Sequence, residues 1–190
     1  MKVTALIVTV LVSTIACKAS AQSIEDAQQF WSGCQTAAKS GKHRPFLDCF
    51  GPDAQAHLFF MVSLWVNAAD SSVTLPAHKK AVAQFNQKIS EFPTKPAPSQ
   101  QVSSVDELIA MLRTTNGDEV IREKLLLSMD LLGELADHES AKSYRGFLRG
   151  MAESDFQNWR RKDGRVTASS GGDVLTFVWI DGLWRILFMG

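Results

Sequence analysis

The feature that most limits the fold of this chain is a pair of β-rich runs near its C-terminus. Residues 173–188 read DVLTFVWIDGLWRILF, in which Asp181-Gly182, the strongest short-range hairpin signal, separates two apolar stretches. Side chains alternate between the faces of a strand, so a two-residue turn places several apolar cross-strand pairs on one face. These pairs are Trp179–Trp184, Phe177–Ile186 and Leu175–Phe188. We predict a hairpin whose apolar face is covered by helices.

A further strand is predicted from Arg165 to Ser170, joined to the hairpin through Gly171-Gly172. Its Val166 and Ala168 would lie on the same apolar face. The residues before it, including Phe156 and Trp159, are expected to form a final helical turn. The C-terminal part of the chain is therefore predicted to be a three-stranded antiparallel meander.

The rest of the chain has the apolar spacing of helices. Ser23-Ile-Glu-Asp26 and Ser104-Val-Asp-Glu107 resemble capping boxes, and Pro52 occupies the first position of a helix that runs to about residue 69. Asp118 is expected to cap the longest helix, which runs to about residue 137. The predicted fold class is α+β: a mainly helical body with a small C-terminal three-stranded antiparallel meander.

One helical segment is apolar on every side. Leu58–Val66 reads LFFMVSLWV, which predicts a helix buried all round. The alternative is an exposed face that serves as a dimer interface or as a docking groove for an apolar ligand.

The N-terminus carries an export signal. Lys2 precedes an apolar run that is too short to span a bilayer, and the run ends at a small-residue cleavage site. We predict a signal peptide over residues 1–21, cleaved between Ala21 and Gln22, and a single globular domain over residues 22–190 with a Pro-rich surface loop at 93–101. The alternative is a lipoprotein anchored through Cys17, although Thr14 stands where that signal has Leu or a similar aliphatic residue. The expected location is periplasmic or secreted.

After cleavage the chain retains two cysteines, Cys34 and Cys49. An even pair in an oxidising compartment predicts a disulfide. A metal site is the alternative, but two thiols need further ligands, and only His43 lies between them.

Charge and motifs restrict the classes of function. The chain has 20 basic and 20 acidic residues, which gives no electrostatic reason to expect nucleic acid as a partner, and no apolar run after the signal is long enough for a transmembrane segment. The sequence contains no Gly-x-Ser-x-Gly elbow, P-loop or dinucleotide-binding glycine run. Its four histidines lack the i, i+4 spacing of a helical zinc site: His43, His57, His78 and His138. No catalytic residue, cofactor or metal is assigned.

Two charged clusters are candidate surfaces. The first is an acidic stripe on the helix expected at 118–137, which could hold Ca²⁺ or form an acid–base pair, or could simply be a solvated face: Glu119, Glu123, Asp130, Glu134 and Asp137, followed by His138. The second is a basic cluster expected between the last helix and the first strand: Arg160, Arg161, Lys162 and Arg165. It could hold an anionic head group, a cell-wall polymer or an acidic partner, or could simply complement the dipole of the preceding helix.

The C-terminal motif Asp181-Gly182-Leu183-Trp184-Arg185-Ile186 resembles the closing hairpin of nuclear-transport-factor-2-like domains, which occur in many exported bacterial proteins. The run Phe46-Leu47-Asp48-Cys49-Phe50-Gly51-Pro52 is similar to the second-helix entry of some of those domains. The resemblance implies a cone built from a strongly bent sheet of four to six strands. It assigns no active-site residue to this chain.

Two functions from different classes are compatible with these features. The first is a non-catalytic binding or interaction module of the cell envelope, whose partner could be a second copy of the chain or another envelope protein. The second is a small periplasmic enzyme or ligand-binding domain with a pocket between the meander and the helices. An enzyme would bring polar side chains with perturbed pKa values together in one apolar pocket. The missing motifs favour the first function.

Overall fold

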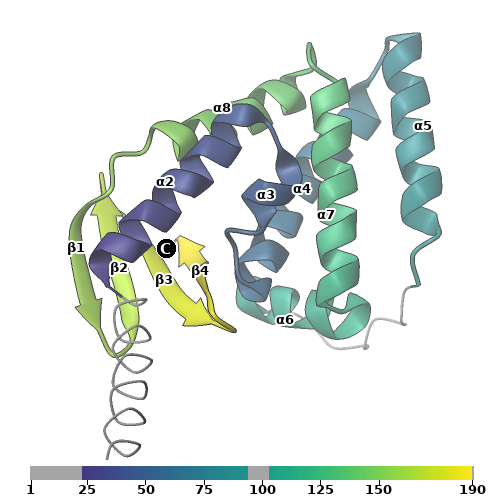
Figure 1. The fold of residues 1–190 in the computed structure, drawn as a ribbon. Helices are drawn as coiled ribbons and strands as arrows, with labels where there is room; N and C mark the ends of the chain where they lie inside the picture. The colour runs from purple at the N-terminus through teal and green to yellow at the C-terminus, as the bar shows by residue number, and fades with distance from the viewer. Residues whose placement is uncertain (1–22, 94–102, 190) are drawn as a thin grey trace, which may run out of the picture.

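The computed structural model describes residues 23–93 and 103–189, and Figure 1 shows a sheet at one end of the molecule and helix α5 at the other. The predicted cleavage site at Ala21–Gln22, the alternative anchor at Cys17 and most of the Pro-rich loop at 93–101 lie outside the described residues. The fold class is confirmed at the level of a mainly helical chain with a C-terminal antiparallel sheet.

Helix α2, Ile24–Ser40, begins at the capping box that the sequence predicts. The Ser23 hydroxyl accepts a hydrogen bond from the Asp26 N–H, and the Asp26 carboxylate accepts one from the Ser23 N–H, so the capping box is complete. Gly41 follows with φ +63°, a left-handed conformation that stops the helix.

The next two helices flank the segment that connects the helical body to the sheet. The short α3 spans His43–Leu47, and α4, Pro52–Ser72, starts at Pro52 as predicted. Helix α4 packs against α6, α7, α8 and β4. The predicted burial on all sides is wrong, because this packing leaves Met61 37% and Leu64 55% exposed.

The remaining helices are α5 (Pro76–Ser90), α6 (Val105–Asn116), α7 (Asp118–Glu134) and α8 (Glu139–Glu153). Among the described helices α4, with 21 residues, is longer than α7, with 17, so α7 is not the longest helix. The α7 cap is Gly117 rather than Asp118, whose carboxylate instead accepts hydrogen bonds from the Arg113 guanidinium. Ser104 caps α6, but the Glu107 carboxylate binds the N–H of Ser103, so this capping box is only half formed.

The described part of the chain forms a four-stranded antiparallel sheet, not the predicted three-stranded one, in the order β1 (Gln157–Lys162), β2 (Arg165–Ser170), β3 (Asp173–Ile180) and β4 (Leu183–Met189). Strand β1 replaces the expected helical turn. Its sequence, QNWRRK, shows no apolar alternation because it is an exposed edge strand. The signal that could have found it is Asp163-Gly164, a second Asp-Gly turn with positive φ at both residues.

The β3–β4 hairpin has most of the predicted register. Asp181 and Gly182 have φ of 51° and 81°, and Trp179 faces Trp184. Phe177 also faces Ile186 as predicted, but Leu175 faces Met189 rather than Phe188. The reason is an irregularity in the pairing that places one extra residue in β4 after Ile186.

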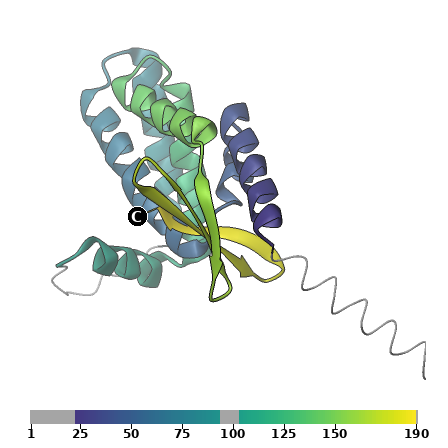
Figure 2. The ribbon, with the colours of Figure 1, turned by 90° about the vertical axis from the view of Figure 1, so that its left-hand side faces the viewer.

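The inner face of the sheet is buried under α2, as predicted. The rings of Phe30 and Trp31 contact Phe177 at centroid distances of 6.3 and 6.2 Å, and Trp159 stacks on Phe177 at 5.2 Å. Figure 2, turned so that the sheet end faces the viewer, shows the strands in front of the helical body. The opposite, outer face of the sheet is the one that remains accessible.

Candidate functional site

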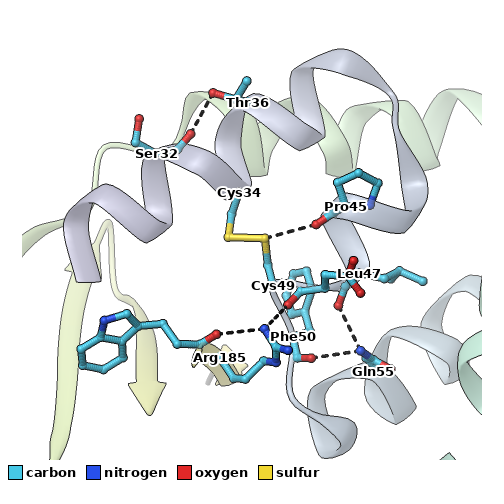
Figure 3. Close-up of a disulfide and its surroundings, with 11 residues drawn as sticks. Ser32, Cys34, Thr36, Pro45, Leu47, Cys49, Phe50, Gln55 and Arg185 are labelled. Carbon is cyan, nitrogen blue, oxygen red and sulfur yellow. Dashed lines mark hydrogen bonds between the residues drawn. A yellow bond between two sulfur atoms is a disulfide. The ribbon is translucent and has the colours of Figure 1, made fainter. Parts of the chain in front are cut away.

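A disulfide ties α2 to the segment between α3 and α4. The sulfur atoms of Cys34 and Cys49 lie 2.23 Å apart, and both residues are buried (Figure 3). The bridge joins the two cysteines that the sequence pairs.

The segment that carries Cys49 also closes one edge of the sheet. The Gly51 N–H donates to the Ile186 carbonyl at 2.8 Å, and the Ile186 N–H donates to the Cys49 carbonyl at 2.8 Å. The Arg185 guanidinium donates to the Asp48 carbonyl at 2.7 Å (Figure 3). Hydrogen bonds from residues 49–51 therefore protect the outer edge of β4, which would otherwise offer unpaired backbone groups.

The outer face of the sheet carries cationic side chains from three strands. Alternation turns Val166, Phe177 and Ile186 toward the core, so their strand neighbours point outward. One cross-strand row on the outer face consists of Lys162, Arg165, Val178 and Arg185. In the next row Arg160 faces Thr167. The described strands place no carboxylate at these outward positions.

Three of these cations have no ion-pair partner in residues 23–93 and 103–189. Arg160, Lys162 and Arg165 are exposed, and they form no ion pair with the described residues. Arg161 lies on the inner side of β1, because it alternates with its neighbours.

The predicted place of the basic cluster, between the last helix and the first strand, is wrong. The cluster belongs to β1 and to the first residue of β2, while α8 already ends at Glu153. The dipole of α8 therefore does not explain it, because that effect fades within the last turn of a helix.

Exposed aliphatic side chains lie beside the cations. Val174, Ile180 and Leu183 are 40%, 37% and 53% exposed, and all three point outward from β3 and β4. We call this set of outward cations and aliphatic residues, all exposed except the half-buried Val178, the basic–aliphatic face: Arg160, Lys162, Arg165, Val174, Val178, Ile180 and Leu183. The sequence showed the basic cluster but not its aliphatic neighbours, because only the register brings them together.

The residues of the predicted acidic stripe make separate contacts and do not form one site. Asp130 binds His43 at 2.7 Å, Glu123 lies 3.5 Å from Arg44, and Asp137 is outside α7, which ends at Glu134. Over residues 23–93 and 103–189 no group of three or more His, Cys, Asp or Glu side chains could hold a metal ion. Asp130 and Glu134 line a shallow groove of about 90 Å³ between α5 and α7.

The histidines take part in local contacts. His138 caps α8, because its Nδ1 accepts a hydrogen bond from the Ser140 N–H, and its Nε2 lies 3.1 Å from the Ser72 hydroxyl. His57 binds the Asp53 carbonyl through Nδ1 at 2.9 Å. Among the described residues these two histidines therefore stabilise helix ends and turns.

A second groove, of about 360 Å³, lies between α2 and α8. Lys39, Arg145 and Arg149 surround a floor that includes Leu148 and Ala152. The sequence could not predict this groove, because its two walls lie more than 100 residues apart in the chain. Its three cations are all exposed.

Two buried ionisable side chains lie in different surroundings. Lys124 binds the Asn116 side chain at 2.8 Å, and burial lowers the pKa of its ammonium group. Tyr144 lies against His43 and Trp65, and burial, followed by the charge of Asp130, raises the pKa of its hydroxyl. Sequence reasoning missed the His43–Asp130 contact because 87 residues separate the two.

The Tyr144 hydroxyl is buried without a hydrogen-bond partner among the described residues. An unsatisfied buried polar group costs about 1–3 kcal/mol. We therefore expect Tyr144→Phe to raise the free energy of unfolding, measured by urea denaturation, by up to about 1 kcal/mol. A loss of stability would show that the hydroxyl has a structural partner.

None of the described helices is both long enough and apolar enough to cross a membrane. Comparisons with family models, with curated proteins and with solved structures found no match to this chain. The resemblance of the hairpin to nuclear-transport-factor-2-like domains therefore remains a prediction.

Proposed function

We propose that this protein is an exported, non-catalytic interaction module of the cell envelope that binds an anionic partner through its basic–aliphatic face. The observation that carries the proposal is the outer face of the sheet, where cations without ion-pair partners among the described residues lie beside exposed aliphatic side chains. Exposed apolar side chains rimmed by charges are typical of interaction surfaces.

The distribution of charge supports a local binding surface. The whole chain carries as many basic as acidic residues, so its net charge gives no general attraction to polyanions. Lys162 and Arg165 are direct cross-strand neighbours and like charges, an arrangement that is unfavourable in the free protein. An anionic partner would relieve this repulsion.

The export part of the proposal rests on the N-terminal sequence and on the cysteines. The apolar run and small-residue site at residues 3–21 have the pattern of a signal peptide. The Cys34–Cys49 disulfide supports it, because such bonds persist in oxidising compartments.

The surroundings of the buried ionisable groups favour binding over catalysis. Lys124 contacts Asn116 and the Phe92 ring, whereas Tyr144 contacts His43 and Trp65. An active site would bring such groups together in one pocket. A periplasmic enzyme or ligand-binding domain with a pocket between the sheet and the helices is the alternative proposal.

We expect the purified protein to be retained on immobilised heparin, used as a polyanionic probe. The double variant Lys162→Gln/Arg165→Gln should elute at a lower salt concentration, because two of the three exposed cations of the face are lost and exposed charge contacts are screened by salt. Elution volume against a salt gradient is the measurement.

The matched control is Lys79→Gln/Lys80→Gln, which removes two exposed cations from α5 at the other end of the molecule (Figure 1). The control should elute with the unmodified protein. Equal elution of both double variants, or no retention of the unmodified protein, would contradict the proposed surface.

A further inference from the structure

We infer that the partner of the basic–aliphatic face is the surface of an anionic phospholipid membrane. The inference rests on the proposed function, and it specifies the partner from the chemistry of the face. The face carries two kinds of side chain on one side of a rigid sheet: long cations, Arg160, Lys162 and Arg165, and exposed aliphatics, Ile180 and Leu183.

The register places the two kinds of side chain side by side. Arg165 faces Val178, and Ile180 follows two residues later on the same face, directly opposite Leu183. At about 3.3 Å per residue, the Ile180–Leu183 pair lies roughly 7 Å from the row of cations. A membrane surface offers both complementary environments within such a distance, since phosphates attract the cations and the boundary of the acyl chains receives the aliphatics.

The geometry favours a face-on contact. Outward side chains stand roughly perpendicular to a sheet, so the cations and the aliphatics project in the same direction. The turn residues Asp163 and Asp181 carry carboxylates at one end of the sheet rather than on its outer rows. They would therefore lie at the rim of the contact, where water can solvate them.

The composition of the face favours lipid over a protein partner. Protein interfaces are enriched in aromatic anchors, whereas their cores are depleted in lysine. Trp159, Phe177 and Trp184 lie on the inner side of the sheet, and no residue of the basic–aliphatic face is aromatic. Flexible cations and small aliphatics suit a fluid surface that lacks fixed pockets.

The test is co-sedimentation of the exported, purified protein with vesicles. One set of vesicles contains phosphatidylglycerol mixed with phosphatidylcholine, and the other contains phosphatidylcholine alone. We expect binding to the anionic vesicles only, and weaker binding at high salt. Lys162→Gln/Arg165→Gln should bind about 30-fold more weakly, because each cation near such a surface contributes a few-fold to affinity.

A second comparison of two double variants tests whether the aliphatic side chains of the face contact lipid. Ile180→Ser/Leu183→Ser removes side chains that are 37% and 53% exposed, and Met61→Ser/Leu64→Ser removes side chains on α4 that are 37% and 55% exposed. We expect about a tenfold loss of vesicle binding for the sheet variant, from the apolar area that no longer enters the membrane, and no loss for the α4 variant. Circular dichroism verifies that both variants are folded.

The outcomes separate the two proposals. Retention on heparin without binding to anionic vesicles would overturn the membrane inference and leave the interaction surface intact. Failure to bind either probe would overturn both. Equal vesicle binding by the sheet and α4 variants would also overturn the inference, because the aliphatics of the face would then make no contact with lipid.

Discussion

Trp184→Ala is expected to lower the free energy of unfolding by about 3–5 kcal/mol, the usual effect of removing a large aromatic side chain from a core. Trp184 is 5% exposed, and its ring meets that of Trp179 edge to face at a centroid distance of 5.5 Å. Such a loss is a large fraction of the stability of a single domain. Urea denaturation of the variant and the unmodified protein, with comparison of midpoints and slopes, measures it.

The adjacent residue provides the control for this prediction. Leu183 points to the other face of the same strand and is 53% exposed, so Leu183→Ala should change stability by less than about 0.5 kcal/mol. Trp179 is only half-buried, so its truncation should cost less than that of Trp184. If Trp184→Ala left stability unchanged but abolished binding, the Trp pair would be a ligand platform and not part of the core.

The sequence was most informative where a local signal has one structural meaning. Asp181-Gly182 predicted a two-residue turn, and from that turn the facing of Trp179 and Trp184 follows by alternation. The capping box at Ser23 and the proline at position 52 fixed two helix starts for the same reason: each satisfies or tolerates backbone groups that only a helix start leaves free.

The predictions were wrong where the structure of an element depends on the elements that pack against it. Strand β1 is held by pairing with β2, so its own residues carry no apolar pattern. The Leu58–Val66 part of α4 is apolar on all sides, but its burial depends on how many elements pack against it, and Leu64 remains exposed. The predicted pair Leu175–Phe188 was wrong for a similar reason, because no local sequence pattern marks the extra residue in β4.

The basic–aliphatic face was likewise predictable from the sequence only in part. The cluster at residues 160–165 is visible in the sequence as consecutive charges, but its place on a strand is not. Alternation then separates Arg161 from Lys162, and the register adds Ile180 and Leu183 from strands further along the chain. A surface made of several strands is therefore predictable only after the register is known.

Removal of the disulfide is the second change with a large expected effect. The bridge links residues 15 positions apart, and closing a loop of that length in the unfolded chain corresponds to about 3 kcal/mol in the chain-entropy model. We expect Cys34→Ala/Cys49→Ala to lose about this much stability. A reducing agent should lower the melting temperature of the unmodified protein and leave that of the double variant unchanged.

The loss of stability on removing the disulfide should also be localised, because the bridged segment is hydrogen-bonded to the sheet. The Gly51 and Ile186 amides donate across the junction between residues 49–51 and β4. Without the bridge this junction should open more often than the β2–β3 pairing, so hydrogen exchange should accelerate at these two amides more than at those shared by β2 and β3. Uniform exchange along the sheet would show that the disulfide stabilises only through the unfolded state. Free thiols at both cysteines in the purified, non-reduced protein, detected by mass spectrometry, would contradict the bridge itself.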